Sequence, residues 1–423
     1  MTKIYFITRG CAVNRSDSEI MAGLLEQSGF EITRKIGSAD VIIFNTCTVK
    51  SPTESSFFSK LKELEKKYPN KKIIVTGCIA QTAPEKLEGY SLLGTTQIHN
   101  IVEVVEETIN NNTVELLVKE KKDKASLPHI RNNPVVEIIQ ICEGCLGHCT
   151  YCKVKQARGE LNSFPKEDIV KHARRAVIKG AKELWLTAQD TGCYGKDMGS
   201  SLPELLKELI NIPGNFRIRL GMLNPNHALE FLDELIDVYK SEKMFKFIHL
   251  PLQSGNDDIL KAMERKYSAE DFKTIIKKIR EKHPNMTIAT DVIAGFPSET
   301  EQQFNDTLNL IKELTPDVIN ISRFWKRSKT KAAKMKKQVH NLERKRRSTL
   351  LTDIYHNIAR MRNERWLNWK GIVLIDEKNK DGSWTARNFA YKPVILNRDL
   401  QLGEQVDVKI IKTTSFDLIA EQI

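Results

Sequence analysis

Short apolar runs alternate with amphipathic segments in the first part of the chain. Strands are predicted at the apolar runs 4–8, 41–44 and 73–75. The helical spacing of apolar residues between them, for example at 19–26, predicts intervening helices, and this order is typical of a parallel α/β domain. A lysine-rich polar stretch at 119–124 indicates a linker, so we predict a first domain over residues 1–122.

The same alternation begins again after the linker. Strands are predicted at 136–141, 183–187, 217–220, 247–250, 287–294 and 318–322. Helical patterns separate them, for example at 166–178 and 269–281. Six strands alternating with helices favour a partial (β/α)6 barrel over residues 130–360, although periodicity alone leaves the closure of the sheet open.

The last part of the chain has a different pattern. A long helical segment at 339–369 precedes short strands with turns at Asp381-Gly382 and Leu402-Gly403, which predicts a small all-β barrel over residues 361–423. No apolar run approaches the roughly 18 residues of a membrane span, and residues 1–6 lack the pattern of a secretion signal. We therefore expect a cytoplasmic protein with no membrane partner.

The positive charge of the chain is concentrated in one window. Residues 322–369 contain fifteen Lys and Arg against three acidic residues, a net charge of +12, which equals that of the whole chain. Such a concentration is expected for a protein that binds a polyanion, usually nucleic acid; the alternative is a solvated helix face. The candidate phosphate contacts are Arg323, Lys326, Arg327, Arg344, Lys345, Arg346 and Arg347.

The cysteines provide the most specific chemical pattern. In a reducing compartment, eight cysteines favour metal binding over disulfides. Cys145, Cys149 and Cys152 form a CxxxCxxC directly after a predicted strand, and three thiolates on one loop can ligate three irons of a 4Fe-4S cluster while leaving the fourth iron open. The alternative is a zinc site with Cys142 as fourth ligand, although four-cysteine zinc sites normally use two separated pairs.

Three further cysteines each follow a predicted strand of the first domain. Cys11, Cys47 and Cys78 come after the strands at 4–8, 41–44 and 73–75. The carboxyl ends of parallel strands lie at one edge of a sheet, so these thiols are expected to converge and to hold a second 4Fe-4S cluster. For Cys142 and Cys193 we expect only a packing role.

These motifs resemble those of the radical S-adenosylmethionine (SAM) methylthiotransferases, and the resemblance covers essentially the whole chain. Three stretches are most similar to the archaeal and eukaryotic branch: Asn45-Thr-Cys-Thr-Val-Lys-Ser, Cys149-Thr-Tyr-Cys-Lys-Val-Lys-Gln-Ala-Arg-Gly and Thr187-Ala-Gln-Asp-Thr-Gly. That branch adds a 2-methylthio group to N6-threonylcarbamoyladenosine at tRNA position 37. The resemblance implies an N-terminal methylthiotransferase domain, a radical SAM barrel and a C-terminal TRAM barrel.

The resemblance also implies cofactors and partners. Cys145, Cys149 and Cys152 would hold the cluster that cleaves SAM, and Cys11, Cys47 and Cys78 the auxiliary cluster that carries the inserted sulfur. One SAM would supply the methyl group and a second the radical. The partners would be tRNA, an electron donor of the flavodoxin or ferredoxin type, and a sulfur source.

Other residues match family positions near SAM. The candidate SAM contacts are Tyr151, Gln189, Asp190, His249, Gln253, Ser254, Thr290 and Asp291. The alternative for each strand-end polar residue is that it satisfies loop backbone. The chain departs from the family at Arg327-Ser-Lys-Thr330-Lys, where an Arg-Pro-Gly-Thr-Pro turn is usual, and this puts the turn geometry in doubt.

In the C-terminal barrel, RNA affinity would depend on particular groups because the tail has about zero net charge. The candidate RNA contacts are Trp384, Arg387, Asn388, Tyr391 and Lys392, which offer phosphate contacts and stacking surfaces. The alternative is an ordinary barrel surface. Two other functions stay open: methylthiolation of isopentenyladenosine in tRNA or of a ribosomal protein aspartate, and a zinc-containing RNA-binding protein without catalysis.

Overall fold

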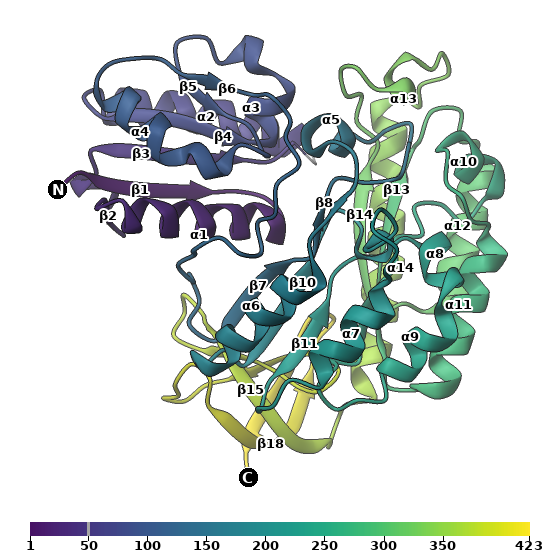
Figure 1. Cartoon of the computed structure of the whole chain (residues 1–423). Coiled ribbons are helices and arrows are strands. Elements are labelled where there is room, and N and C mark those ends of the chain that lie inside the picture. The colour runs from purple at the N-terminus through teal and green to yellow at the C-terminus, as the bar shows by residue number, and fades with distance from the viewer. Residues whose placement is uncertain (49–50) are drawn as a thin grey trace.

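The computed structural model describes residues 1–48 and 51–423, which fold into three parts (Figure 1). The N-terminal part and the C-terminal barrel lie against different sides of a central α/β part. None of the helices in the described residues is long and apolar enough to cross a membrane. This arrangement confirms the expected fold class.

The N-terminal part is a six-stranded sheet in the order β2-β1-β3-β4-β5-β6, in which every neighbouring pair is parallel. Its strands are β1 (Lys3–Thr8), β2 (Glu31–Ile32), β3 (Val41–Thr46), β4 (Lys72–Gly77), β5 (Ser91–Leu93) and β6 (Glu115–Leu116). Its helices are α1 (Ala12–Gln27), α2 (Ser51–Lys67), α3 (Cys78–Thr82) and α4 (Ile101–Ile109). The predicted strands are confirmed, and the helix expected at 19–26 begins earlier, at Ala12.

Helices cover both faces of this sheet because successive strand residues point to opposite sides. Ile43 packs with residues of α1 and α4, while Ile42 and Phe44 pack with residues of α2 and α3. All six residues of β3 are buried, which explains its uninterrupted apolar start in the sequence. This packing fixes the carboxyl ends of β1, β3 and β4, where the three isolated cysteines begin their loops.

The central part contains six parallel strands in two three-stranded groups, β7-β10-β11 and β12-β13-β14. They are β7 (Val136–Gln140), β10 (Glu183–Thr187), β11 (Arg217–Leu220), β12 (Phe247–His249), β13 (Thr287–Ala294) and β14 (Val318–Arg323). A parallel bridge between Ile218 and Met244 connects the groups. Within the described residues β7 and β14 do not pair, so the expected partial (β/α)6 barrel is confirmed and it is open.

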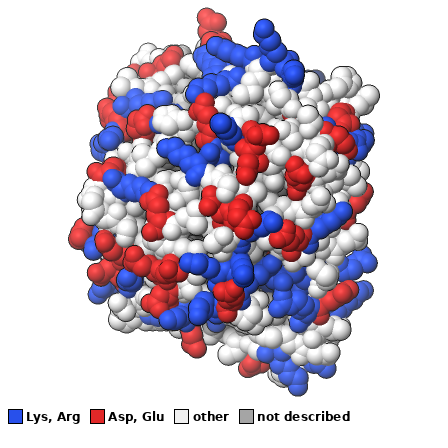
Figure 2. Space-filling view, turned by 90° about the vertical axis from the view of Figure 1, so that its right-hand side faces the viewer, with Lys and Arg blue, Asp and Glu red and all other residues white. Residues whose placement is uncertain are grey.

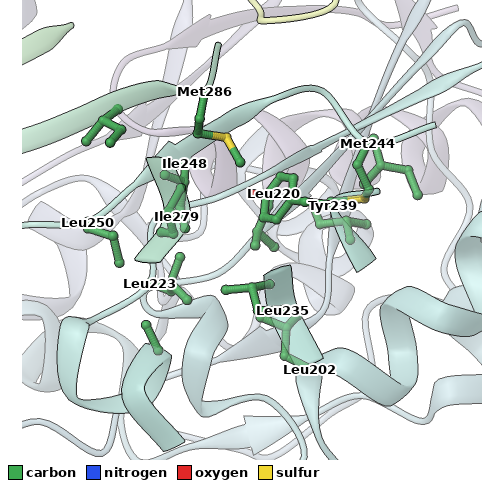
Figure 3. Packing of buried hydrophobic residues seen from close by; sticks show 14 of the residues in the cluster. Leu202, Leu220, Leu223, Leu235, Tyr239, Met244, Ile248, Leu250, Ile279 and Met286 are labelled. Atoms are coloured by element: carbon green, nitrogen blue, oxygen red, sulfur yellow. The ribbon is translucent and has the colours of Figure 1, made fainter. Parts of the chain in front are cut away.

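Helices surround this barrel on its outer side (Figure 1). They are α6 (Lys166–Ile178), α7 (Leu202–Ile210), α8 (Pro225–Glu230), α9 (Leu232–Val238), α10 (Asp257–Ala262), α11 (Ala269–Lys282) and α12 (Glu301–Leu314). Figure 3 shows the core between strands and helices, where Leu220 and Ile248 of the strands meet Leu202, Leu235 and Ile279 of the helices. All of these side chains are buried.

The loops above the barrel carry short elements. These are β8 (Cys142–Glu143), β9 (Asn162–Ser163), α5 (Val154–Arg158) and α13 (Lys331–Lys334). The predicted long basic helix is α14 (Asn341–Glu364), shorter at both ends than the expected 339–369, and it packs on β14. The stretch expected to be a linker is partly buried, because Lys124 is only 2% exposed and belongs to an ion-pair network.

The C-terminal part is a closed five-stranded barrel in the order β15-β16-β17-β19-β18. Its strands are β15 (Lys370–Lys378), β16 (Trp384–Arg387), β17 (Pro393–Leu396), β18 (Gln405–Thr413) and β19 (Leu418–Gln422). This confirms the small all-β barrel. The three sheets span residues 3–116, 136–323 and 370–422. The exact domain boundaries, expected at 1–122, 130–360 and 361–423, stay predictions.

Candidate functional site: two sets of convergent cysteines

The three isolated cysteines lie where the sequence predicted, at the carboxyl ends of neighbouring strands. Cys11 directly precedes α1, Cys47 follows β3, and Cys78 is the first residue of α3 after β4. Because β1, β3 and β4 are adjacent in the sheet, their loops meet at one edge. Cys47 and Cys78 are buried, whereas Cys11 is exposed.

Asn14 connects the three cysteine loops. Its Oδ1 accepts hydrogen bonds from the thiols of Cys11, at 3.6 Å, and Cys78, at 3.9 Å. Its Nδ2 donates to the carbonyl of Thr46, at 2.6 Å, next to Cys47. The side chain is fully buried, so this amide fixes the relative positions of all three loops.

The close approach of these loops requires glycine. A Cβ on Gly10, which has a φ of +129°, would lie 2.7 Å from Cys47 Cβ. A Cβ on Gly77, with a φ of +89°, would lie 2.5 Å from the carbonyl oxygen of Thr46. The glycine before Cys11 and the one before Cys78 therefore allow the loops to pass each other.

The second set lies on the loop between β8 and α5. The backbone N–H of Gly147 donates to Cys145 Sγ at 3.2 Å, and that of Val154 donates to Cys152 Sγ at 3.3 Å. Arg265 Nη1 lies 3.2 Å from Cys149 Sγ. Each sulfur thus has a donor positioned on it, as expected for ligands that carry negative charge.

Burial makes three of these thiols poor acids. Burial raises the pKa of Cys145 to about 12, that of Cys152 to about 11 and that of Cys78 to about 12. A buried thiolate without a partner is costly, so these cysteines suit a site where iron supplies the compensating charge. The donor chemistry, three thiols and one free position in each set, fits a 4Fe-4S cluster.

The spacing of the sulfurs is unsuitable for one zinc ion. A tetrahedral zinc with Zn–S bonds of about 2.3 Å brings its sulfurs to about 3.8 Å from one another. Among the residues that the structure describes, the only group with ligand atoms within 4.8 Å of one another is His129, Glu137 and His172. Neither cysteine set is that compact, and Cys142 is fully buried with its Sγ 3.8 Å from the Asp190 carbonyl.

Several of the residues expected near SAM line the same end of the barrel. His249 Nε2 lies 2.9 Å from Asp291 Oδ2, and Asn320 Nδ2 donates to Asp291 Oδ1 at 2.9 Å. Gln253 has a φ of +66°, a strained backbone that fixes its direction at the strand end. Tyr151 packs edge-on to Phe296, at 6.3 Å between ring centroids.

Other expected SAM contacts are already used to hold the fold. Asp190 is fully buried and accepts from the N–H of Gly192 and of Asn224, both at 3.0 Å. Thr290 Oγ1, also buried, accepts from Leu252 N at 3.0 Å. The observed hydrogen bonds of Asp190 and Thr290 are thus those of strand-end side chains that accept from backbone N–H groups of nearby loops.

The same description applies to two further candidates. Buried Ser254 accepts from Asn256 N at 3.3 Å, and Gln189 Oε1 accepts from Gly144 N at 2.7 Å. The Gln189 bond holds the turn that leads into the CxxxCxxC loop. Its amide therefore positions the cysteine loop, whether or not it also contacts SAM.

The basic window is divided between the surface and the interior. Lys326, Lys345 and Arg346 are exposed, although Arg346 forms ion pairs with Glu301 and Glu343 at 2.5 and 2.7 Å. On the face of the molecule in Figure 2, blue and red side chains are interspersed and form no extended patch of one sign.

Two arginines of this window have internal partners, and their expected RNA contacts stay predictions. Arg347 is 4% exposed and pairs with buried Glu299 at 2.7 Å. Arg327 donates to the carbonyl of Thr48, at the boundary between the N-terminal part and the barrel. The guanidinium of Arg347 is thus held by a buried ion pair, and that of Arg327 by a backbone carbonyl.

Sequence reasoning missed Trp325, which lies just after β14 with the guanidinium groups of Arg323 and Arg344 over its ring, at 5.2 and 5.7 Å from the centroid. A half-buried indole between two arginines can stack a base and hold a phosphate. The aromatic residue within the basic window was the signal that could have found it.

The residues expected to contact RNA in the C-terminal barrel have internal partners, and their RNA contacts stay predictions. Asn388 is fully buried and its Oδ1 accepts from Ala390 N and Lys392 N, both at 3.0 Å. Lys392, 4% exposed, pairs with Asp317 at 3.0 Å. Buried Tyr391 packs on Phe245, with ring centroids 4.8 Å apart. These contacts attach the barrel to the central part.

The remaining two residues of that group have internal partners as well. Trp384 is 6% exposed in the barrel core, with Lys378 Nζ at 5.0 Å from the ring. Arg387 pairs with Asp376 at 2.8 Å and lies over Tyr391, at 4.8 Å from the centroid. The sequence showed cationic and aromatic residues side by side but not which way they point.

The pair Lys392–Asp317 gives a stability prediction. Lys392→Ala removes one of the two cations that pair with the buried carboxylate of Asp317 and leaves Arg362, so we expect a loss of about 1.5–3 kcal/mol and a clear fall in the Tm. Lys412→Ala, at an exposed position of β18, is the control and should change stability by less than about 0.5 kcal/mol. Thermal unfolding of both variants measures this, and equal Tm values would contradict the attachment role.

Comparison with known families finds three matches along the chain. Residues 3–92 match the model described as Uncharacterized protein family UPF0004. Residues 139–311 match the Radical SAM superfamily, and residues 372–423 match the TRAM domain. Their order is that of the three parts of the structure.

Curated relatives match along almost the entire chain. A probable threonylcarbamoyladenosine tRNA methylthiotransferase of Pyrococcus horikoshii is 41% identical, with 100% of both chains covered. The threonylcarbamoyladenosine tRNA methylthiotransferase of Drosophila melanogaster is 41% identical over 99% of this chain and 77% of its own. That of Homo sapiens is 40% identical over 97% of this chain and 72% of its own.

Solved structures support the fold. The radical S-adenosylmethionine methyltransferase TsrM of Kitasatospora setae, with cobalamin and a [4Fe-4S] cluster bound, has a TM-score of 0.58 at 13% identity. The match covers 79% of this chain and 77% of that one. At this identity the similarity concerns the fold alone.

Proposed function

Because the chain belongs to the threonylcarbamoyladenosine tRNA methylthiotransferases, a family of radical SAM enzymes, we propose that it inserts a methylthio group at C2 of N6-threonylcarbamoyladenosine 37 of tRNA. It would use two SAM and two 4Fe-4S clusters. An electron donor of the flavodoxin or ferredoxin type and a sulfur source would act with it in the cytoplasm.

The convergence of two separate cysteine sets is the observation that carries this proposal. Cys145, Cys149 and Cys152 would hold the cluster that supplies the electron for SAM cleavage. Cys11, Cys47 and Cys78 would hold the cluster that supplies sulfur. The two sets are adjacent, since α5 begins beside Cys152 and packs against α3, which begins with Cys78.

The protein's own groups would bind and orient the reactants. Asn14 fixes the three N-terminal loops, and Arg265 donates to Cys149 from the barrel side. Tyr151, His249, Gln253 and Asp291 remain candidates for contact with SAM. Tyr151 lies on the cysteine loop, His249 and Gln253 lie at and after the end of β12, where barrels of this type form their site, and Asp291 on β13 contacts His249. Trp325, between Arg323 and Arg344, would stack a base of the anticodon loop.

The exposed lysines of the basic window allow a test of the RNA role. Lys326→Gln/Lys345→Gln should weaken the binding of all tRNAs alike, because each lysine that neutralises a phosphate releases counterions. The slope of log affinity against log salt should fall by up to roughly two units, at about 0.7 to 0.9 per contact. Fluorescence anisotropy with labelled tRNA measures both quantities; unchanged affinity and slope would show a solvated face.

The proposed substrate is tested in cells. In a strain that lacks its own enzyme for this step, expression of the chain should convert N6-threonylcarbamoyladenosine to its 2-methylthio derivative, measured by mass spectrometry of tRNA nucleosides. Appearance of 2-methylthio-isopentenyladenosine, or of a methylthiolated aspartate in a ribosomal protein with unchanged tRNA, would replace the proposed substrate by one of these two.

A further inference from the structure

Arg158 connects the two cysteine sets through one short helix. The first residue of α5, Val154, donates its N–H to Cys152 Sγ at 3.3 Å. The last, Arg158, donates from Nη2 to Asn14 Oδ1 at 2.9 Å, and its positive charge acts to lower the pKa of the Cys78 thiol against the effect of burial. That oxygen is the one that accepts from the thiols of Cys11 and Cys78.

The guanidinium of Arg158 is buried within a balanced group of charges. The residue is 3% exposed, and its Nη1 lies 2.7 Å from Asp17 Oδ2 and 2.7 Å from Glu143 Oε1. Lys124 Nζ lies 3.1 Å from Asp17 Oδ1 and 2.9 Å from Glu143 Oε2. Two cations and two carboxylates therefore neutralise each other at the edge of the N-terminal cysteine site.

We propose that Arg158 is a positioning residue that holds Cys78 and raises the reduction potential of the auxiliary cluster. This rests on the proposed function, in which Cys78 is a cluster ligand. Hydrogen bonds to ligand sulfurs and the local net charge set the potential of iron–sulfur clusters. Because the group as a whole is neutral, the effect of Arg158 is local: its guanidinium donates to Asn14, the amide that holds Cys11 and Cys78. A cation on this side of the group favours the reduced cluster, which carries one more negative charge.

The variants separate this role from the stability of the ion pairs. Arg158→Gln alone would leave two buried carboxylates with one lysine, and the chain could then fail to fold. Arg158→Gln/Glu143→Gln keeps one cation, Lys124, against one carboxylate, Asp17. Glu143→Gln alone is the matched control, because it keeps Arg158 and adds net positive charge. Arg158→Lys retains the charge but not the forked donor geometry.

The measurement is a redox titration followed by electron paramagnetic resonance. The full chain carries Cys145→Ala/Cys149→Ala/Cys152→Ala, so that the signal comes from the N-terminal set. For Arg158→Gln/Glu143→Gln we expect at least a tenfold fall in the reduced-to-oxidised ratio at fixed potential, which corresponds to about 59 mV for one electron. Glu143→Gln should raise the reduced-to-oxidised ratio. The ratio for Arg158→Lys should lie between that of the double variant and that of the chain with native Arg158. Equal ratios in all chains would overturn the proposal.

Cluster loading distinguishes the remaining outcomes. If the chain with native Arg158 holds no iron and sulfide, the auxiliary cluster of the proposed function is absent. If the Glu143→Gln variant holds the cluster and the double variant does not, cluster binding requires Arg158, which supports its positioning role. If both lose the cluster, the effect belongs to the ion pairs and the proposal is wrong.

Discussion

Cys149→Ala is expected to abolish the formation of 5′-deoxyadenosine from SAM. Cys149 is the central cysteine of the CxxxCxxC loop, and its sulfur lies 3.2 Å from Arg265 Nη1. A cluster with two protein ligands in place of three would lose its attachment and its positioned open iron, so reductive SAM cleavage should fall below detection. Liquid chromatography of the anaerobic reaction with dithionite and SAM measures this.

Cys193→Ala is the matched control for this variant. Cys193 is a fully buried thiol beside Cys142, outside both cysteine sets, and its removal should leave SAM cleavage near the native rate. Persistent 5′-deoxyadenosine formation by Cys149→Ala would show that another group ligates the iron.

Cys47→Ala is expected to separate SAM cleavage from product formation. Cys47 belongs to the N-terminal set, and its Cβ lies close to Gly10, in the loop of Cys11. Loss of this ligand should remove the sulfur-carrying cluster while the CxxxCxxC loop stays intact. 5′-Deoxyadenosine should therefore still form, whereas the methylthio nucleoside should be undetectable.

Both products are measured in the same reaction, with Cys193→Ala again as the control. If Cys47→Ala forms the methylthio nucleoside at the native rate, the N-terminal cysteines are structural. If it also stops cleaving SAM, the two sets do not act separately, and the division of roles between them is wrong.

Much of the fold was predictable because strand and helix periodicity differ clearly in this sequence. The short apolar run in β3, rich in β-branched residues, favours a strand, and the spacing in α6 favours a helix; the structure contains both. The convergence of Cys11, Cys47 and Cys78 followed from a topological rule, that the ends of parallel strands lie at one edge.

Side-chain direction was not predictable from the sequence. Lys392 and Lys326 are both lysines near aromatic residues, but Lys392 is buried on Asp317 and Lys326 faces solvent. Asp317 lies 75 residues away in the sequence. A charge count cannot find such long-range partners. It therefore could not show that Lys392 pairs with a residue of the central part.

The unusual turn at 327–331 illustrates a related limit. Lys329 occupies the position where the methylthiotransferase family usually has glycine, and its φ is +64°. Lys329 thus adopts the left-handed conformation without being glycine, at a cost of about 1–2 kcal/mol. Thr330 caps α13 by accepting from Ala333 N at 3.3 Å, which helps to hold the turn. The sequence put the geometry of this turn in doubt, and the structure has a turn here with Lys329 in the left-handed conformation.

The central claim is that this chain adds a methylthio group to N6-threonylcarbamoyladenosine in tRNA. Its most direct test uses anaerobically reconstituted protein, tRNA that carries this nucleoside, a sulfide source, a reductant and SAM with a deuterated methyl group. Mass spectrometry should detect the 2-methylthio nucleoside with the deuterated methyl on the inserted sulfur. Unchanged N6-threonylcarbamoyladenosine in a reaction that does produce 5′-deoxyadenosine would contradict the claim.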